Sequence, residues 1–302
     1  MKQTLLTLSL FLATFLNANA QYTQTINTNR PSSSMGAYSV SKEIFQIEGG
    51  YVYQNDSFSS EQYNTQNNIQ LQFRYGDIFE QLEFVGDIVY NNYELTINNS
   101  INKGSGFKTA TFGAKYLIYD HYKYYVEKRN VYSWKANQRF KWRRLIPAIS
   151  VYAGGQFNTK HNIYYPELPD IGLKTMLIAQ QHLSKRFSIT YNFVGENITN
   201  ENFENYYYII TASLGLSDRF SIFGEHYGVF SRKYFENTIP FKQEANLKAG
   251  ITYKINPNLQ IDGFGGTSIN NTPHKIQAGI GVSWRNQKKY IFKDHSEVTD
   301  TY

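Results

Sequence analysis

Apolar and polar residues alternate along most of this chain, and the alternation is cleanest towards its carboxyl end. Between residues 244 and 254 the odd-numbered positions are apolar, and between residues 275 and 285 the even-numbered positions are. Because successive side chains of a β-strand point to opposite faces, each segment predicts a strand with one apolar and one polar face. Along the whole chain the pattern predicts twelve strands: 44–54, 66–75, 80–93, 106–118, 146–157, 171–182, 186–196, 205–216, 219–230, 242–254, 258–268 and 275–285.

The connections between these segments fall into two classes by length. Tight turns are expected around residues 75–78, 183–186, 217–219 and 255–258. Short turns at one end and long loops at the other are typical of a transmembrane β-barrel of a bacterial outer membrane, with the short turns in the periplasm. An even number of strands leaves both ends of the barrel on that side. Longer loops rich in Asn and Ser are expected near 55–65, 94–105, 158–170, 197–204, 231–241 and 269–274.

One predicted strand has no clear facing. In residues 219–230, Phe220 and Ile222 have one parity, whereas Phe223 and Tyr227 have the other. The pattern therefore predicts the strand without deciding which of its faces contacts lipid.

The first twenty residues have the pattern of a cleaved signal peptide. Lys2 gives a positive start, residues 5–16 are apolar, and Ala18 and Ala20 form a small-x-small cleavage site. An apolar stretch this short does not span a bilayer, which takes about 20 residues. Export behind such a signal makes the cell outer membrane the expected location of the barrel.

Composition narrows the class of protein further. The mean hydropathy of −0.50 argues against a helical membrane protein, but it suits a barrel, in which only alternate residues contact lipid. Aromatic residues, chiefly Tyr and Phe with a few Trp, make up 17% of the chain, and aromatic side chains favour the two membrane interfaces. The chain has no cysteine, which excludes disulfides and thiol chemistry.

One predicted connection departs from the rule of lengths. Residues 119–145 fall where a short turn belongs, and they hold eight basic and two acidic residues interleaved with aromatic ones. The surplus of six equals the formal net charge of the whole chain, +6. Such a segment fits adhesion to an anionic surface, but a long solvated insertion is the interpretation that the pattern favours. Export makes nucleic acid an unsuitable partner.

The expected organisation is a single barrel with short flanking parts. It comprises the signal peptide (1–20), an N-terminal periplasmic or plug segment (21–43), an all-β, antiparallel transmembrane barrel (44–285, including the insertion 119–145) and a polar tail (286–302).

Several short motifs connect the chain with a known family. N-T-N-R-P at residues 27–31, V-S-K at 40–42 and F-Q-I-E-G-G at 45–50 together resemble the T-D-R-P … V-P-x-G … Q-x-E-x-G opening of the family of the MetA-pathway of phenol degradation. Asn29 stands where that family usually has Asp, and Ser41 where Pro is common. Further similar turn-and-strand motifs are L-S-K-R-F-S at 183–188, D-R-F-S-I-F-G-E at 218–225 and N-P-N-L-Q-I-D at 256–262.

The resemblance implies a twelve-stranded barrel and passage of a solute across the outer membrane. Members are usually described simply as transporters, and the group includes a channel that exports functional-amyloid subunits. The resemblance implies no chemistry and no cofactor.

Two sets of residues are candidates for function. Asn29, Arg30 and Pro31 precede the first strand, so they could fold into the lumen as a plug or constriction, with Arg30 pairing with lumen carboxylates; a cap at the periplasmic mouth or an assembly signal are the alternatives. Parity places a second set, charges of both signs, inside the barrel, where pairing is expected. Its members are Glu48, Arg74, Glu83, Asp87, Lys115, Lys174, Glu244, Lys248 and Asp262.

Turn geometry predicts two ion pairs within this second set and its neighbours. Arg74 and Glu83 lie near a cross-strand diagonal at the turn around residues 75–78. Lys254 and Asp262 are placed similarly at the turn around residues 255–258. No His-x-x-x-His spacing or carboxylate cluster predicts a metal site, and no residue is assigned a catalytic role. The sequence therefore favours a protein that is not an enzyme and needs no cofactor.

The function that the sequence favours is a channel for small solutes, including apolar or aromatic ones, across the outer membrane. An export pore for a secreted, amyloid-like polypeptide and a non-transporting structural or adhesive barrel are the alternatives. The expected partners are the lipid bilayer with its lipopolysaccharide and the outer-membrane assembly machinery. The solute, its direction and the oligomeric state stay open.

Overall fold

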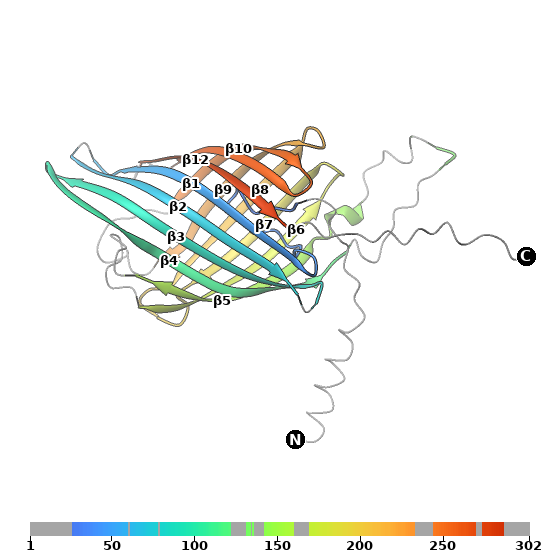
Figure 1. Ribbon diagram of the computed structural model, residues 1–302, viewed down its shortest axis with the longest axis horizontal. Coiled ribbons are helices and arrows are strands. Elements are labelled where there is room, and N and C mark those ends of the chain that lie inside the picture. Colours follow the sequence, from blue (N-terminus) through green and yellow to red (C-terminus); the bar gives the residue numbers. More distant parts are fainter. Residues whose placement is uncertain are drawn as a thin grey trace, which may run out of the picture.

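Twelve antiparallel strands close into one barrel, in which β1 pairs with β12 (Figure 1). The computed structural model describes residues 26–59, 61–77, 79–121, 131–133, 135, 142–159, 169–232, 244–269 and 274–286. The predicted strand number and antiparallel barrel are confirmed. The strands are β1 (Ile44–Ser57), β2 (Gln62–Gly76), β3 (Leu82–Ile97), β4 (Ser100–Tyr119), β5 (Ala148–Asn158), β6 (Ile171–His182), β7 (Phe187–Glu196), β8 (Asn205–Gly215), β9 (Phe220–Arg232), β10 (Ala245–Asn256), β11 (Leu259–Ser268) and β12 (His274–Arg285).

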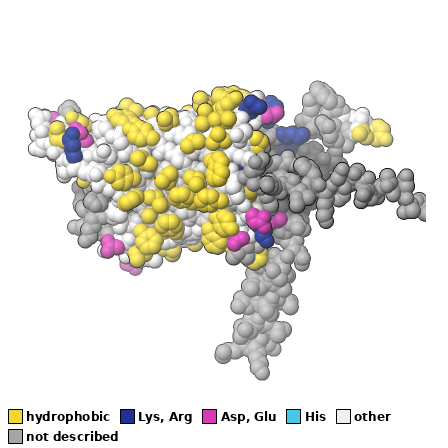
Figure 2. Space-filling model, viewed as in Figure 1, with side chains coloured by type: hydrophobic (Ala, Val, Ile, Leu, Met, Phe, Trp, Pro, Cys, Tyr) yellow, Lys and Arg dark blue, Asp and Glu magenta, His cyan; other side chains and the backbone are white. Residues whose placement is uncertain are grey.

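The outer surface of the barrel is apolar and suits a bilayer. Ile69, Ile251 and Ile280 are each half-exposed or more on the outward parity of their strands. Figure 2 shows apolar side chains spread over the side of the barrel, with charged ones gathered at its two ends. Within the described residues, no helix has the length and apolar character needed to cross a membrane.

The β1–β2 and β3–β4 hairpins are longer than the alternation predicts. The expected loops near 55–65 and 94–105 are wrong, because β1 and β2 continue to within four residues of each other and β3 and β4 are separated by Asn98 and Asn99 alone. Both asparagines have positive φ (47° and 66°), as a tight hairpin turn requires and Asn tolerates. Strands pair through backbone groups. The pairing therefore continues into the polar ends of these strands, where the sequence no longer alternates.

The facing of β9 is set by its neighbours. Ile222 pairs with the outward Ile251 of β10, whereas Phe223 is 8% exposed and lies inside. Glu225 has the same inward parity and is also buried. The lumen side of β9 therefore carries Phe223 and Glu225.

The ends of the barrel lie together at the side of the short turns. Gln46 near the start of β1 pairs with Arg285 at the end of β12. Of the predicted insertion 119–145, the structure describes its two flanks, including a 3₁₀ turn at Trp142–Leu145, and a few residues between them. The predicted signal peptide 1–20 and nearly all of the tail 286–302 lie outside the described residues.

Candidate functional site

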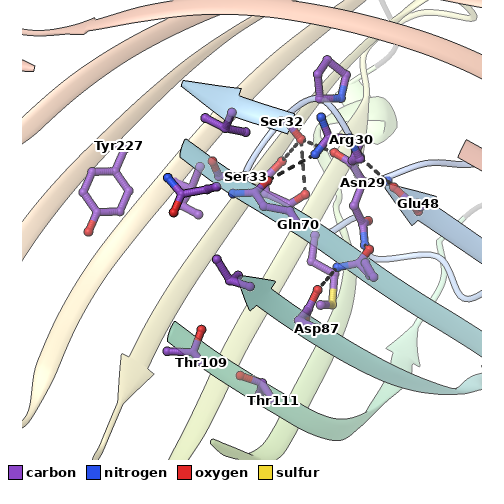
Figure 3. A pocket seen from close by; sticks show the side chains of 18 of the residues that line it. Asn29, Arg30, Ser32, Ser33, Glu48, Gln70, Asp87, Thr109, Thr111 and Tyr227 are labelled. Atoms are coloured by element: carbon purple, nitrogen blue, oxygen red, sulfur yellow. Dashed lines mark hydrogen bonds between the residues drawn. The ribbon is translucent and has the colours of Figure 1, made fainter. Parts of the chain in front are cut away.

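Residues 26–42, here called the inner segment, precede β1 and lie inside the barrel. Ile26, Met35, Ala37 and Val40 are buried, although a segment outside the wall would expose them. Figure 3 shows residues 29 and 30 beside Glu48 of β1, and further hydrogen bonds join the inner segment to Asn192 of β7 and Glu225 of β9 across the lumen. The candidates Asn29, Arg30 and Pro31 therefore lie in the lumen rather than at its mouth.

Four fully buried charges from β1 to β4 hold both the start and the end of the inner segment. Arg74 binds Glu83 with two bonds of 2.6 and 3.1 Å, as the sequence predicts, and reaches Glu48 at 3.2 Å. Lys115 lies 3.3 Å from Glu83 Oε2, which Arg74 also binds. Two acids and two bases thus alternate at 0–1% exposure. Burial of such charges is tolerated only when each is paired and hydrogen-bonded.

The same four side chains bind the main chain of the inner segment. Glu48 accepts hydrogen bonds from the N–H groups of residues 29 and 30, at 3.0 and 2.9 Å. Arg74 donates to the carbonyl of residue 27 at 2.6 Å, and Glu83 accepts from the N–H of residue 40 at 2.7 Å. Lys115 donates to the carbonyls of residues 36 and 38. These four of the predicted lumen charges thus bind a peptide segment and do not form a ring of one sign.

Arg30 lies in a slot between the first and last strands. Gly50 of β1 and Gly281 of β12 are register partners, and a Cβ built on either would overlap the Arg30 side chain. The guanidinium reaches Asp262 at 3.3 Å and Gln70 at 3.2 Å. Glycine at both positions leaves the space for the guanidinium, which a Cβ would force to move.

Two consequences follow for the sequence-based expectations. The expected pair of Lys254 with Asp262 is wrong, because Asp262 binds Arg30 from the inner segment instead. The glycine slot was missed, since Gly50 and Gly281 are 231 positions apart and become neighbours only when the barrel closes. Only the register of β1 against β12 would have shown that the two glycines are neighbours.

Neutral side chains bind the middle of the inner segment, at residues 35 and 37. Asn192 accepts from the N–H of Met35 at 2.6 Å and donates to its carbonyl at 2.9 Å. Gln180 accepts from the N–H of Ala37, and Ser150 donates to its carbonyl. Sequence reasoning missed these residues, because polar residues on the lumen parity of a strand carry no further signature.

Glu225 and Lys248 bind the turn of the inner segment. Glu225 accepts from the N–H of Ser33 at 2.7 Å and pairs with Lys248 at 3.1 Å. The lysine also contacts the hydroxyl of Ser33. Lys248 was expected in the lumen, whereas Glu225 was not singled out because the facing of its strand was undecided.

An apolar stripe covers the lumen wall beside the inner segment. Met35 and Ala37 pack against it, so the segment joins a charged side of the lumen to an apolar one. The buried wall residues of the stripe, from β3 to β8, are Val85, Leu117, Ala148, Tyr152, Met176, Ile178, Val194, Tyr207 and Ile209.

A cavity of about 350 Å³ lies above the inner segment, towards the loop end of the barrel. Residues 29–35 form its floor, and Asp87 and Lys174 lie in its wall (Figure 3). Asp87 accepts from Gln72 at 2.6 Å, and Lys174 pairs with Glu196 at 2.9 Å. A second cavity of about 350 Å³ shares part of this wall and reaches the loop ends of β5 and β8. Together they form a polar vestibule that ends at the inner segment.

The last predicted lumen charge lies apart from this site. Glu244 precedes β10 at the loop end and pairs with Lys275 of β12. Among the described residues, no three His, Asp or Glu side chains converge as metal ligands would.

A serine close to a histidine base can act as a nucleophile. One His-x-Ser spacing occurs in the chain, at His182 and Ser184. The ring of His182 lies 5.5 Å from that of Tyr38 in the inner segment. Ser184 Oγ instead accepts from the N–H of Phe187 at 2.9 Å within the β6–β7 turn. The serine thus has a local role in forming the turn.

The sequence from the N-T-N-R-P motif to the end of β12 matches one family. The family described as "Putative MetA-pathway of phenol degradation" matches residues 28–286, which include all but the first two residues of the inner segment and every strand. The chain belongs to this family. A comparison with curated proteins finds no match.

Solved structures similar to the barrel are outer-membrane proteins. An outer membrane channel from Pseudomonas putida F1 has a TM-score of 0.54 at 8% identity, covering 86% of this chain and 100% of that one. The Pseudomonas putida toluene transporter TodX has a TM-score of 0.46 at 8% identity (89% and 95% covered). The translocator domain of the autotransporter NalP from Neisseria meningitidis also reaches 0.46 at 8% identity (85% and 90% covered). Similarity at this identity shows the fold alone.

The protein is an outer-membrane β-barrel. A closed barrel with an even number of antiparallel strands, an apolar outer side and a polar interior is the architecture of bacterial outer-membrane proteins. The fold and the family agree with that location.

Proposed function

We propose that the protein is an outer-membrane channel for small solutes and that its inner segment is the plug. One observation carries the proposal: the floor of the vestibule consists of residues 29–35, which belong to the inner segment and not to the barrel wall. Displacing the inner segment would therefore open a path to the short-turn end without changing any strand pair. Solute selection then depends on the width and the lining of the lumen, with no covalent step and no cofactor.

The lining supports solutes that combine an apolar or aromatic body with a polar group. The stripe that Met35 and Ala37 cover would face the path once the segment leaves, while Asp87 and Lys174 line the approach. Apolar walls with a few placed polar groups are typical of small-molecule sites. The family description names phenol degradation, so phenol is a suitable test solute.

Conductance in planar bilayers tests the proposal. The full-length protein is compared with a variant lacking residues 21–42, and both are also tested by swelling of liposomes in small sugars and by uptake of phenol. We expect low conductance from the full-length protein and stable, larger openings from the deletion variant. Folding of both barrels is checked by circular dichroism. A deletion variant that is folded and silent in every assay would show that the protein is not a channel.

A further inference from the structure

The barrel holds the inner segment mainly through its main chain. Barrel side chains bind six N–H groups, those of residues 29, 30, 33, 35, 37 and 40. They also bind five carbonyls, those of residues 27, 35, 36, 37 and 38. These groups are present in every polypeptide. The wall therefore recognises features that are independent of most of the side chains in the segment.

The chemistry of the wall matches the polarity of a peptide. Glu48, Glu83 and Glu225 are acceptors for N–H groups, and Lys115 and Arg74 are donors to carbonyls. Hydrogen bonds to charged groups are stronger than neutral ones. Asn192 binds both polar groups of one residue, as a neighbouring strand would. Direction and register of a bound chain are thus fixed by the wall.

Side-chain requirements are few: an apolar residue against the stripe at Met35, small residues after it, and one arginine. Ala37 is fully buried, and a Cβ at residue 36 would lie 3.3 Å from Gln180 Oε1, so only small residues fit there. Ser32 bonds within the segment itself, to the carbonyl of residue 29. Arg30 makes the specific contact, because its guanidinium occupies the glycine slot and reaches Asp262.

We propose that the lumen is a binding site for a bent polypeptide segment that carries one arginine and, a few positions on, an apolar residue followed by small ones, and that a separate chain can occupy it in place of the inner segment. This activity goes beyond conduction of small solutes. The occupant enters from the short-turn end, where the inner segment joins β1 at exposed residues 42 and 43. Its arginine lies in the slot and small residues follow within a few positions.

The experiment uses the full chain, folded with its own segment in place. A protease site introduced between Lys42 and Glu43 is cut after folding, which turns the inner segment into an exchangeable peptide. A fluorescent peptide of residues 26–42 is then titrated and its anisotropy measured. An uncut variant, Arg30→Ala, is titrated in parallel, because loss of the slot contact weakens the hold on the segment while its main-chain bonds and its link to β1 stay.

Four peptides separate main-chain recognition from side-chain recognition. N-methylation at residue 29, 35 or 37 removes one N–H donor, and each is expected to weaken binding about tenfold or more. A peptide with Ser32→Ala and Ser34→Ala is expected to bind within about threefold of the original, since no main-chain donor is lost. In the barrel, Asn192→Ala is expected to weaken binding, and Gln156→Ala, which faces the lumen beyond the segment, serves as its control.

Two results would overturn the inference. One is that neither the cut protein nor the Arg30→Ala protein takes up the labelled peptide. The other is that N-methylated peptides bind as well as the original. A barrel that conducts after the cut but binds no peptide would reject this inference and leave the channel proposal intact.

Discussion

At the scale of single residues, closure of the lumen depends on two glycines that leave room for one arginine. Gly50 and Gly281 leave the space that the Arg30 guanidinium fills, and Asp262 supplies the countercharge at 3.3 Å. An arginine fits this role because its planar, permanently charged group binds several acceptors at once.

Filling the slot should therefore release the inner segment. Gly281→Ala places a methyl group where Arg30 lies, and overpacking of this kind costs about 1–3 kcal/mol. A cost of that size changes the ratio of closed to open states by roughly 5–150-fold. Single-channel recordings are expected to show a higher open probability, with Gly50→Ala behaving alike. Gly224→Ala is the control, because a Cβ there meets nothing within 4 Å; equal behaviour of all three variants would rule out the slot.

The buried charges should differ sharply from exposed ones in their effect on stability. Glu83→Gln leaves Arg74 and Lys115 without their shared carboxylate at 0% exposure, and breaking a buried pair costs about 3–5 kcal/mol. Glu94→Gln breaks the pair with Lys103, whose side chains are 39% and 65% exposed, and should cost about 0–1 kcal/mol. The free energy of unfolding in urea, measured in detergent micelles, distinguishes the two. Similar losses of unfolding free energy in both variants would show that the buried carboxylate contributes no more than an exposed one.

At the scale of elements, the sequence predicts the strands well and the inner segment poorly. Alternation reports which side of a strand contacts lipid, so β6, β7 and β12 were located almost to the residue. It fails where lipid ends, as in the hairpin closed by Asn98 and Asn99. Contacts of the inner segment depend on registers of strands distant in the chain. Among its partners, only charged residues such as Glu48 could be singled out beforehand.

The inner segment should leave the lumen when its apolar contact is lost. Met35→Asp would bury a carboxylate against the apolar stripe, and a buried charge without a partner is costly enough to displace the segment. We expect faster liposome swelling than with the wild-type protein. Ser32→Asp, at a partly exposed position on the vestibule side of the same segment, should change swelling little. If the Met35 variant swells no faster than this control, the apolar contact does not hold the segment.

At the scale of the whole molecule, the barrel separates two solvents, and each side of the wall has its own rule. The outward side tolerates no charge near the centre of a strand, whereas the lumen tolerates charges that find partners. Ile280 lies at the centre of β12, outward and 67% exposed. Gln277 lies on the same strand and lines the vestibule.

The same substitution on the two sides should therefore give opposite results. Ile280→Arg places a guanidinium in hydrocarbon and is expected to cost about 2–4 kcal/mol, seen as a lower free energy of unfolding from lipid vesicles and less folded protein in outer membranes. Gln277→Arg reaches the vestibule, so we expect nearly unchanged stability and an altered preference for anions over cations in the open channel. Reversal potentials in a salt gradient measure that preference. A stable Ile280→Arg variant would contradict the assignment of this face to lipid, because only contact with water would leave an arginine there without cost.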